Sequence, residues 1–496
     1  MAWVWTAVAA VAAVLYLLQQ LLSLKNKKKL PPGPKGIPIL GHFHLMGKNP
    51  HQDFYHLARK HGGIMYMRFG FIPTVIVSSP GAAELFLKTH DLVFASKPPN
   101  QAAKYISYDQ RGIVIGPYSP YWRQMRKLIT LEMLSNLRIN QFQPMRKAEL
   151  GKMISSIKQA AQEGQTVDLS SRVSGLSADM TCLMVFGRKY SDGDLDEKGF
   201  KDVIADTLAI AAAFSLVDYF PFLERLDLQG ITQRMKELSK IFDGFLEKII
   251  EDHVLNKNEN KQTHDFVDTM MAIMESGEAG FEFDRRNIKA VLLDMLIAGL
   301  DTSATAVEWA LSELIKRPEA MQRLKEELQE VVGMDKMVDE SHLEHLRYLD
   351  FVIREALRLH PVVPMLTRFS MEDCTLDGFH IPKDTRVLVN VWAIGRDPEY
   401  WPEPEKFMPE RYFDRKVDLK GRDFQLIPFG SGRRSCPGMQ LGLTSVRMVL
   451  AQLVHCFDWT LPDGVPPTEL DMTEKFGLVT ARANHLEALP TYRLHK

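Results

Sequence analysis

Residues 429–438 read Phe-Gly-Ser-Gly-Arg-Arg-Ser-Cys-Pro-Gly, and this stretch constrains how the rest of the chain is interpreted. Its first two glycines permit tight backbone turns, and Pro437 can begin a helix that continues through residues 441–454. Cys436 therefore stands at a predicted helix N-terminus, next to two arginines. Both features lower the pKa of a thiol and favour the thiolate, which is the form that binds metal.

No second cysteine or histidine lies near Cys436 at the spacing of a zinc site. A single thiolate suits a haem iron instead, because the porphyrin supplies the equatorial ligands. Residues 429–438 resemble the haem-binding loop of the cytochrome P-450 superfamily, Phe-x-x-Gly-x-Arg-x-Cys-x-Gly, and match it at every fixed position. The resemblance implies a cytochrome P-450 fold, haem b as cofactor, Cys436 as the axial iron ligand and Phe429 as a haem contact.

Hydrophobic periodicity outside this loop predicts a mainly α fold with a smaller β part. Residues 64–69, 74–78 and 375–391 have strand character, whereas helical patterns such as residues 232–256 dominate the body. A long core helix is expected over Arg285–Lys316, capped by Asp284, with a length of about 50 Å.

The centre of that helix contains Ala298-Gly-Leu-Asp-Thr302, although glycine and a buried carboxylate both cost stability there. The residues alone leave two interpretations open: a functional site, or a kink in which Thr302 bonds back to the carbonyl four residues earlier. The segment resembles the oxygen-activation motif of the family. This resemblance implies that Ala298 lies against the haem and that Asp301 and Thr302 help to deliver protons.

Two further segments resemble family motifs in the same chain order. Glu355 and Arg358 match Glu-x-x-Arg, and their three-residue spacing places both on one helix face. Residues 409–412 resemble Pro-Glu-Arg-Phe, with tyrosine in the last position. Taken alone, Glu355 and Arg358 would form a surface pair of small energetic value. The resemblance implies instead a buried structural clamp of Glu355, Arg358 and Arg411.

Several basic residues are expected to bind the haem carboxylates. Trp122 and Arg126 match the family's Trp-x-x-x-Arg, and both would contact the cofactor. The resemblance also implies that Arg126, Arg368 and Arg434 bind the two propionates, since arginine forks satisfy carboxylates in a nearly dry pocket.

Within the superfamily the chain resembles plant A-type enzymes. Residues 111–118 depart from the commoner pattern of a segment that usually forms a substrate wall, so the pocket is expected to be altered. The candidate pocket residues are apolar and fit either a phenylpropanoid-derived aromatic or a terpenoid, of which the aromatic is favoured. They are Ile113, Val114, Phe214, Leu296, Ile297, Val363, Met365, Leu478 and Val479.

The N-terminus has the pattern of a membrane anchor. Residues 1–24 carry no charged side chain and are followed at once by four lysines within residues 25–29. Because positive charge stays on the cytosolic side, this order predicts one transmembrane helix with the catalytic domain in the cytosol. The resemblance to plant A-type enzymes implies that the membrane is that of the endoplasmic reticulum. Residues 25–36 form a basic, proline-rich linker, and residues 37–496 form the haem-thiolate domain. A removed or interfacial segment is the alternative.

Composition limits the choice of partners. The net charge of −1 gives no reason to expect nucleic acid, and four cysteines in 496 residues do not make a disulfide framework. The chain contains no Gly-x-Gly-x-x-Gly and no Walker loop, so electrons must come from another protein. The resemblance implies an NADPH-cytochrome P-450 reductase in this role.

These observations predict a membrane-bound monooxygenase that hydroxylates a lipophilic secondary metabolite with O2 and NADPH. Two alternatives from other classes remain. A haem-thiolate isomerase or dehydratase would need no O2, and family members of that kind commonly lack the threonine found at Thr302. A non-catalytic haem-binding protein would not require Asp301, Thr302 or the basic residues near Cys436.

Overall fold

The computed structural model describes residues 29–189, 213–256 and 263–495, together with residues 203, 204, 206, 207, 209 and 210. The predicted anchor, residues 1–24, and the start of the linker, residues 25–28, lie outside the described residues. The predicted fold class is confirmed for the part that is described, which is mainly helical with several small sheets.

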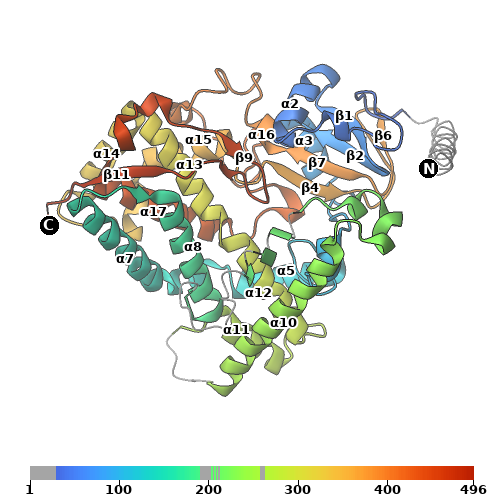
Figure 1. Cartoon of the computed structure of the whole chain (residues 1–496), viewed down its shortest axis with the longest axis horizontal. Helices are drawn as coiled ribbons and strands as arrows, with labels where there is room; N and C mark the ends of the chain where they lie inside the picture. Colours follow the sequence, from blue (N-terminus) through green and yellow to red (C-terminus); the bar gives the residue numbers. More distant parts are fainter. Residues whose placement is uncertain are drawn as a thin grey trace, which may run out of the picture.

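Long helices fill most of the body, and the largest sheet lies at one end of it (Figure 1). The helix predicted over residues 232–256 is confirmed with a shift of one residue at each end. In chain order the α-helices are α2 Pro50–His61, α3 Pro80–Glu84, α4 Gln101–Tyr105, α5 Pro120–Glu132, α6 Asn136–Gln141, α7 Gln143–Gln162, α8 Leu169–Phe186, α10 Ile231–Leu255, α11 Phe266–Ser276, α12 Arg285–Gly299, α13 Thr302–Lys316, α14 Pro318–Val332, α15 Arg347–Leu359, α16 Val391–Ile394 and α17 Met439–Cys456.

The largest sheet joins two distant parts of the sequence in the order β1-β2-β7-β4. The strands β1 (Ile64–Phe69) and β2 (Ile72–Val77) form an antiparallel pair, and β2 runs parallel to β7 (Arg386–Asn390), which pairs with β4 (Met365–Phe369). The strands predicted near residues 64–78 and 375–391 are thus confirmed. The smaller sheets contain β3 Val167–Asp168, β8 Phe457–Thr460 and β11 Glu487–Tyr492; β5 Cys374–Leu376 and β6 Phe379–Ile381; and β9 Glu474–Lys475 and β10 Ala481–Arg482.

The long helix predicted over Arg285–Lys316 is present, but it is interrupted into α12 and α13 at Leu300 and Asp301. Asp284 caps α12 as predicted, by accepting backbone hydrogen bonds from Arg286 and Asn287. The interruption follows a glycine, a weak helix former, and Asp301 stands at the N-cap of α13 without a capping hydrogen bond from its side chain. A kink here was one of the two interpretations that the sequence left open, and the hydrogen bond it implies, from the Thr302 hydroxyl to the Ala298 carbonyl, is present at 2.7 Å.

The interrupted helix is part of the core. Over Arg285–Lys316 its mean hydropathy reaches 1.5, and among the described helices it is the one with the length and apolar composition to cross a membrane. However, 67% of its apolar window is buried inside the protein. The α13 half joins α7, α8, α14, α15 and α17 in the largest hydrophobic cluster, and the α12 half joins α5, α8, α10 and α11 in the second. The interruption therefore lies where two clusters meet.

The described end of the predicted linker is packed onto the body. The Tyr66 N–H donates to the Pro32 carbonyl at 2.8 Å, and the His380 N–H donates to the Lys29 carbonyl at 2.7 Å. A Cβ at Gly33 would lie 2.0 Å from the Tyr66 carbonyl oxygen, so β1 approaches the linker too closely for a side chain there. The described end of the linker is therefore held against the body by these contacts.

Candidate functional site

Cys436 ends a loop whose backbone is closed by a hydrogen bond from its own N–H to the Phe429 carbonyl at 2.8 Å. The loop contains the short 3₁₀ turn Gly432–Arg434, and α17 begins at Met439, two residues later than the predicted start at Pro437. Gly432 has φ 70°, and a Cβ there would lie 2.4 Å from the Leu87 carbonyl oxygen. Only glycine fits this position, which brings the loop against the segment near Leu87.

The Cys436 side chain is accessible even though protein surrounds it. Burial raises the pKa of its thiol, whereas the Gly438 N–H and the Arg126 guanidinium act to lower it. A sulfur atom that lines a space within the protein is both accessible and surrounded by protein, so burial can raise its pKa. The other three cysteines are less accessible: Cys182 and Cys456 are buried and Cys374 is intermediate.

Four basic side chains gather beside this loop: Lys97, Arg126, Arg368 and Arg434. Burial lowers the pKa of Arg368 to about 10, an effect that nearby Asp91 opposes and Arg126 reinforces. Burial also lowers the pKa of Arg434 to about 9, with further lowering by Arg368 and Arg126. For Lys97, burial and the charges of Arg368 and Arg434 lower the pKa well below its ordinary value. The cluster thus holds positive charge that the neighbouring carboxylates do not balance.

The three arginines of this cluster differ in their hydrogen-bond partners. Arg126 donates to the Ser435 carbonyl, and Arg434 donates to the carbonyls of Ala95, Ile113 and Gly116. The Arg434 guanidinium also lies 3.9 Å from the centre of the Trp122 ring. Arg368, which is 3% exposed, has a buried Nη2 with no hydrogen-bond partner among the described residues. Such an orphaned donor is costly unless an acceptor is supplied from outside the chain.

The interruption between α12 and α13 exposes side chains in the middle of the core. Ala298 and Asp301 are accessible, whereas residues 291–296 and 304–315 are buried. The Thr302 hydroxyl donates to the Ala298 carbonyl at 2.7 Å. No hydrogen bond from the described part of the chain reaches the Asp301 carboxyl, whose pKa is raised by burial. A Cβ on Gly442 of α17 would lie 3.8 Å from the Ser303 hydroxyl, so this interruption lies beside the helix that follows Cys436.

Glu355, Arg358 and Arg411 form the network that the sequence predicted. Arg358 donates to both oxygens of Glu355 at 2.8 Å, and both side chains are fully buried. Arg411 donates to the same carboxylate at 3.0 Å, and the Met408 N–H at 2.9 Å. The remaining Arg358 donors bind the carbonyls of Gly395, Pro404 and Lys406. The clamp fixes the segment of residues 395–411 against α15.

Comparison with known proteins identifies the family. The family model described as Cytochrome P450 matches residues 31–486. The chain is 49% identical to "Cytochrome P450 CYP736A12" of Panax ginseng over 486 residues, which cover 97% of this chain and 96% of the relative. The chain belongs to the cytochrome P450 family.

Other relatives have names that state an activity. The chain is 38% identical to "Flavonoid 3',5'-hydroxylase" of Solanum melongena, over 97% of this chain and 94% of the relative. It is also 38% identical to "3,9-dihydroxypterocarpan 6A-monooxygenase" of Glycine max, over 95% and 94%. The predicted enzyme class is therefore confirmed: this cytochrome P450 is an oxidoreductase of the monooxygenase class. The family implies a haem-thiolate iron.

The described residues fit a haem. Cys436 supplies one accessible thiol, and the orphaned Nη2 of Arg368 lies within a cluster that also contains Lys97. Haem brings two carboxylates, which are the partners that this excess of positive charge requires. The small side chain of Ala298 leaves accessible surface at the centre of the helix. Donor, counter-charges and space are thus all present.

Lys97 is a residue of this cluster that the sequence prediction omitted. It stands in Ala-Ser-Lys97-Pro-Pro, a context that does not distinguish it from a solvated surface lysine. Its significance arises from its position beside Arg368 and Arg434, and this juxtaposition comes from three distant parts of the chain.

The predicted pocket residues fall into two groups. Ile297, Val363, Met365, Leu478 and Val479 all keep accessible surface. The Thr480 N–H donates to the Val362 carbonyl at 2.8 Å, so the last four of these residues come from adjacent segments. Val114 also remains accessible, next to α12. These six side chains are able to line a pocket.

Three predicted pocket residues are placed elsewhere. Leu296 is 1% exposed, because successive helix positions turn by about 100° and it points away from the accessible Ala298. Ile113, 5% exposed, packs its side chain into the second core cluster. Phe214 is 48% exposed and stacks on Tyr219, with a ring-centre distance of 5.2 Å, in a surface aromatic cluster that includes Phe43. Sequence position alone did not reveal which way these side chains point.

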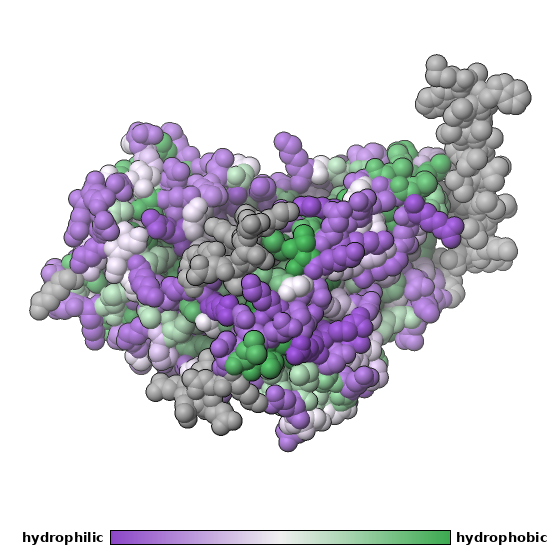
Figure 2. Space-filling view, turned by 60° about the horizontal axis from the view of Figure 1, so that its bottom comes forward, coloured by the Kyte–Doolittle hydropathy of each residue, from purple (hydrophilic) through white to green (hydrophobic). Residues whose placement is uncertain are grey.

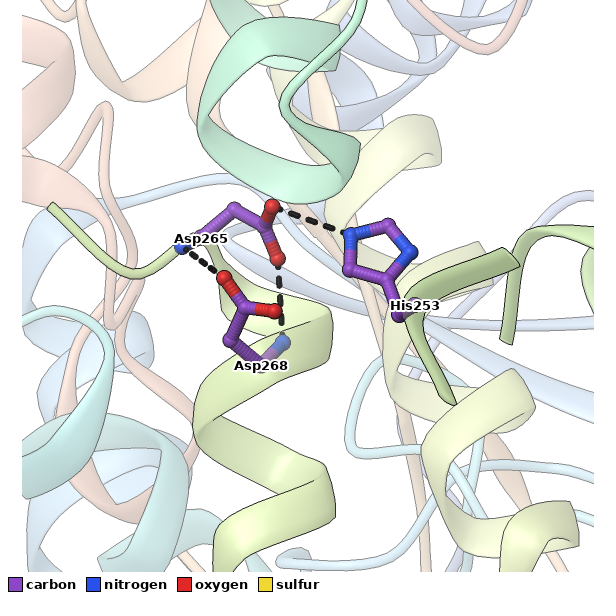
Figure 3. Close-up of side chains that lie close together, drawn as sticks. All are labelled: His253, Asp265 and Asp268. Carbon is purple, nitrogen blue, oxygen red and sulfur yellow. Dashed lines mark hydrogen bonds and ion pairs between the residues drawn. The ribbon is translucent and has the colours of Figure 1, made fainter. Parts of the chain in front are cut away.

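A separate group of possible metal ligands lies between α10 and α11 (Figure 3). The Asp265 carboxylate accepts a hydrogen bond from the Asp268 N–H at 3.0 Å, and the Asp268 carboxylate accepts one from the Asp265 N–H at 3.1 Å. The two residues thereby form the capping box of α11. His253 points from α10 towards Asp265, at 3.0 Å, and its other ring nitrogen lies 2.7 Å from the Ile249 carbonyl. Helix capping and these two contacts account for the cluster without a metal ion.

Proposed function

We propose that this cytochrome P450 is an NADPH- and O2-dependent hydroxylase of a lipophilic plant secondary metabolite, with Cys436 as the iron ligand. The carrying observation is the accessible Cys436 thiol beside unbalanced basic side chains. A phenylpropanoid-derived aromatic is favoured over a terpenoid. The support for this preference is the pair of relatives named as a flavonoid hydroxylase and a pterocarpan monooxygenase, together with the apolar character of the accessible pocket candidates.

The chain's own residues have distinct tasks in this proposal. When bound, the haem with its thiolate ligand supplies the activation of dioxygen. Lys97, Arg126, Arg368 and Arg434 hold its carboxylates. The Asp301 carboxyl is accessible and burial raises its pKa, which favours its use as a group that accepts and releases a proton. The Thr302 hydroxyl, one residue away, can accept a hydrogen bond from a water while it donates to Ala298, and it can relay a proton once it turns away from that carbonyl.

Electrons are proposed to come from a membrane-bound NADPH-cytochrome P450 reductase at the surface beside Cys436. Arg126 reaches from α5 to the Ser435 carbonyl, so α5 packs along the Cys436 loop. Arg123 and Lys127, on the same helix, are exposed. Exposed basic residues attract an acidic partner and mainly increase its rate of association.

The proposed location is the cytosolic face of the endoplasmic reticulum membrane, with residues 1–24 as the anchor and residues 37–496 as the catalytic domain. Figure 2 shows hydrophobic residues at the end of the molecule that carries β1 and β2, and smaller hydrophobic patches elsewhere on a largely hydrophilic face. An apolar patch at this end would rest on lipid. Its exposed members include Ile37, Leu40, Phe71, Phe214, Phe222, Leu226 and Leu228.

Reconstitution with a plant reductase tests the proposal. Flavonoids, pterocarpans and terpenoids are first screened for spectral shifts of the haem on binding, and the compounds that bind are then incubated with NADPH. Hydroxylated aromatic products are expected only when O2, NADPH and reductase are all present. Product formation without O2 would support an isomerase or dehydratase instead. Binding confined to terpenoids would overturn the preference for aromatics.

A further inference from the structure

The loop between α4 and α5 is held by polar side chains from one helix, α12. Arg111 in the loop donates to Asp284 at 3.0 Å and to Asn287 at 3.1 Å. Asn287 donates to the Tyr121 hydroxyl at 2.7 Å, and this hydroxyl donates to the Arg111 carbonyl at 2.8 Å. Asp294 lies two helical turns beyond Asn287 and therefore faces the same side. The N-terminal half of α12 thus presents a polar stripe to this loop.

Asp294 makes the innermost of these contacts. Its carboxylate is 1% exposed, and its Oδ2 accepts hydrogen bonds from the Ile113 N–H and, at 3.2 Å, from the Val114 N–H. Burial raises the pKa of this carboxyl to about 7, although both N–H groups and Arg434 act in the opposite direction. A Cβ at Gly112 would lie 2.4 Å from the same oxygen. Glycine at this position is therefore what allows the carboxylate to reach the two N–H groups.

The Ile113 peptide is also held from the opposite side. Its carbonyl accepts from Trp122 Nε1 at 3.0 Å and from Arg434 at 3.1 Å. Arg434 belongs to the Cys436 loop and also binds the carbonyl of Gly116 at 2.6 Å. The peptide unit that joins Ile113 to Val114 is consequently fixed between α12, α5 and the Cys436 loop.

The loop needs such external contacts because its own backbone is unfavourable. Tyr108, Asp109 and Gln110 have successive φ values of 53°, 56° and 64°. Left-handed conformations cost L-residues roughly 1 kcal/mol each relative to right-handed ones. If the contacts were released, the loop would relax away from this conformation. Its placement is therefore decided by the residues that bind it.

From this geometry we propose that Asp294 is a positioning residue that fixes the pocket wall at Val114 and so limits the size of ligand that reaches the iron. Asp294, Ile297 and Ala298 lie on one face of α12, because spacings of three and four residues align on a helix. The backbone of half-buried Val114 is thus bound by Asp294, which lies about one helical turn before Ala298, where the cofactor site opens. The inference deepens the proposed function and rests on its haem site.

The experiment uses the haem-loaded enzyme and azoles of increasing size, which bind the iron without turnover. Imidazole, 4-phenylimidazole and a triphenylmethyl-substituted imidazole are titrated against the wild type, Asp294→Asn and Asp294→Val. Asparagine keeps an acceptor oxygen for the two N–H groups, whereas valine keeps a similar volume without one. Glu308→Gln is the control: Glu308 is also a buried carboxylate, on α13, but its partners are Ser170 and Arg482 and not the loop.

Asp294→Val should bind imidazole within about two-fold of the wild type, and its preference for the largest azole over imidazole should rise by at least about five-fold. Asp294→Asn and Glu308→Gln should stay near the wild-type ratio.

Gly112→Ala pushes the carboxylate away from the two N–H groups and should therefore resemble Asp294→Val. It replaces that variant if valine prevents folding. An unchanged ratio with an intact haem spectrum, or an equal change in Glu308→Gln, overturns the inference. A wild type that binds no haem would contradict the proposed function instead.

Discussion

At the scale of single residues, Thr302 has a contact that fits either a structural or a catalytic role, because its hydroxyl donates to the Ala298 carbonyl at 2.7 Å. We predict that Thr302→Ala binds substrate and accepts electrons but forms several-fold less product for each NADPH, with more hydrogen peroxide. The reason is that the hydroxyl is needed for proton delivery rather than for either earlier step. Product, peroxide and NADPH are measured together.

Thr302→Ser keeps the hydroxyl and should restore most of the wild-type ratio of product to NADPH. If Thr302→Ala changes thermal stability but leaves this ratio at the wild-type value, the residue is structural and the catalytic assignment is wrong.

Asp294 gives a pH dependence of stability with a defined sign. Burial raises the pKa of this carboxyl from 3.8 to about 7, so the folded state binds more protons than the unfolded state between these values. The free energy of unfolding should therefore fall as the pH rises through this window, by about 4 kcal/mol at most. Asp294→Asn cannot ionise. The melting temperature of this variant should therefore rise relative to that of the wild type as the pH increases from about 5 to about 8. A constant difference in melting temperature between the two proteins over this range would contradict the assignment.

The residues with specific motif positions could be predicted from the sequence, whereas those defined by long-range contacts could not. Cys436, Glu355, Arg358 and Arg411 each have a fixed place in a motif. Lys97 and Asp294 matter because of neighbours that lie far away in the chain. One signal for Asp294 was available: it is a lone carboxylate within Leu-Leu-Asp-Met-Leu, the same kind of anomaly that singled out Asp301.

At the scale of secondary-structure elements, the clamp that joins α15 to the segment near Arg411 should dominate local stability. Glu355→Gln leaves the buried Arg358 without its carboxylate and should cost about 3–5 kcal/mol, because an uncompensated buried charge is expensive. Chemical denaturation and haem content report the loss. The matched control is Glu84→Gln, which breaks the exposed pair with Lys88 and should change stability by less than about 1 kcal/mol. Equal effects in both variants would show that the clamp is not structural.

Elements with strong periodicity were predictable, but the exact places where they are interrupted were not. The helix over residues 232–256 and the strand at residues 64–69 follow directly from the spacing of apolar residues. A kink between α12 and α13 was one of two interpretations left open, but its position could not be fixed, because apolar residues continue through it and only Gly299 and Asp301 disfavour a regular helix. Residues 25–36 were predicted as a basic, proline-rich linker, and the prolines gave no indication that its described end is hydrogen-bonded to Tyr66 and His380 of the body.

At the scale of the whole molecule, the packed linker defines where the anchor can be removed. Deletion of residues 1–28 should leave a folded, haem-binding protein that is partly released from membranes, with residual attachment through the apolar patch. Deletion of residues 1–36 also removes the hydrogen bonds to Tyr66 and His380 and should lower the melting temperature further. Membrane fractionation and haem spectra check both variants. If the shorter deletion already abolishes haem binding, the N-terminal segment belongs to the fold.

The account depends most on Cys436 as the iron ligand, and the spectrum of the reduced, CO-bound protein tests this directly. The wild type should absorb at the thiolate position, as should Cys182→Ser, Cys374→Ser and Cys456→Ser, because none of these cysteines lies in the haem-binding loop motif of residues 429–438. Cys436→Ser should lose this absorption completely. Retention of the thiolate spectrum in Cys436→Ser, with its loss in one of the other three variants, would contradict the account.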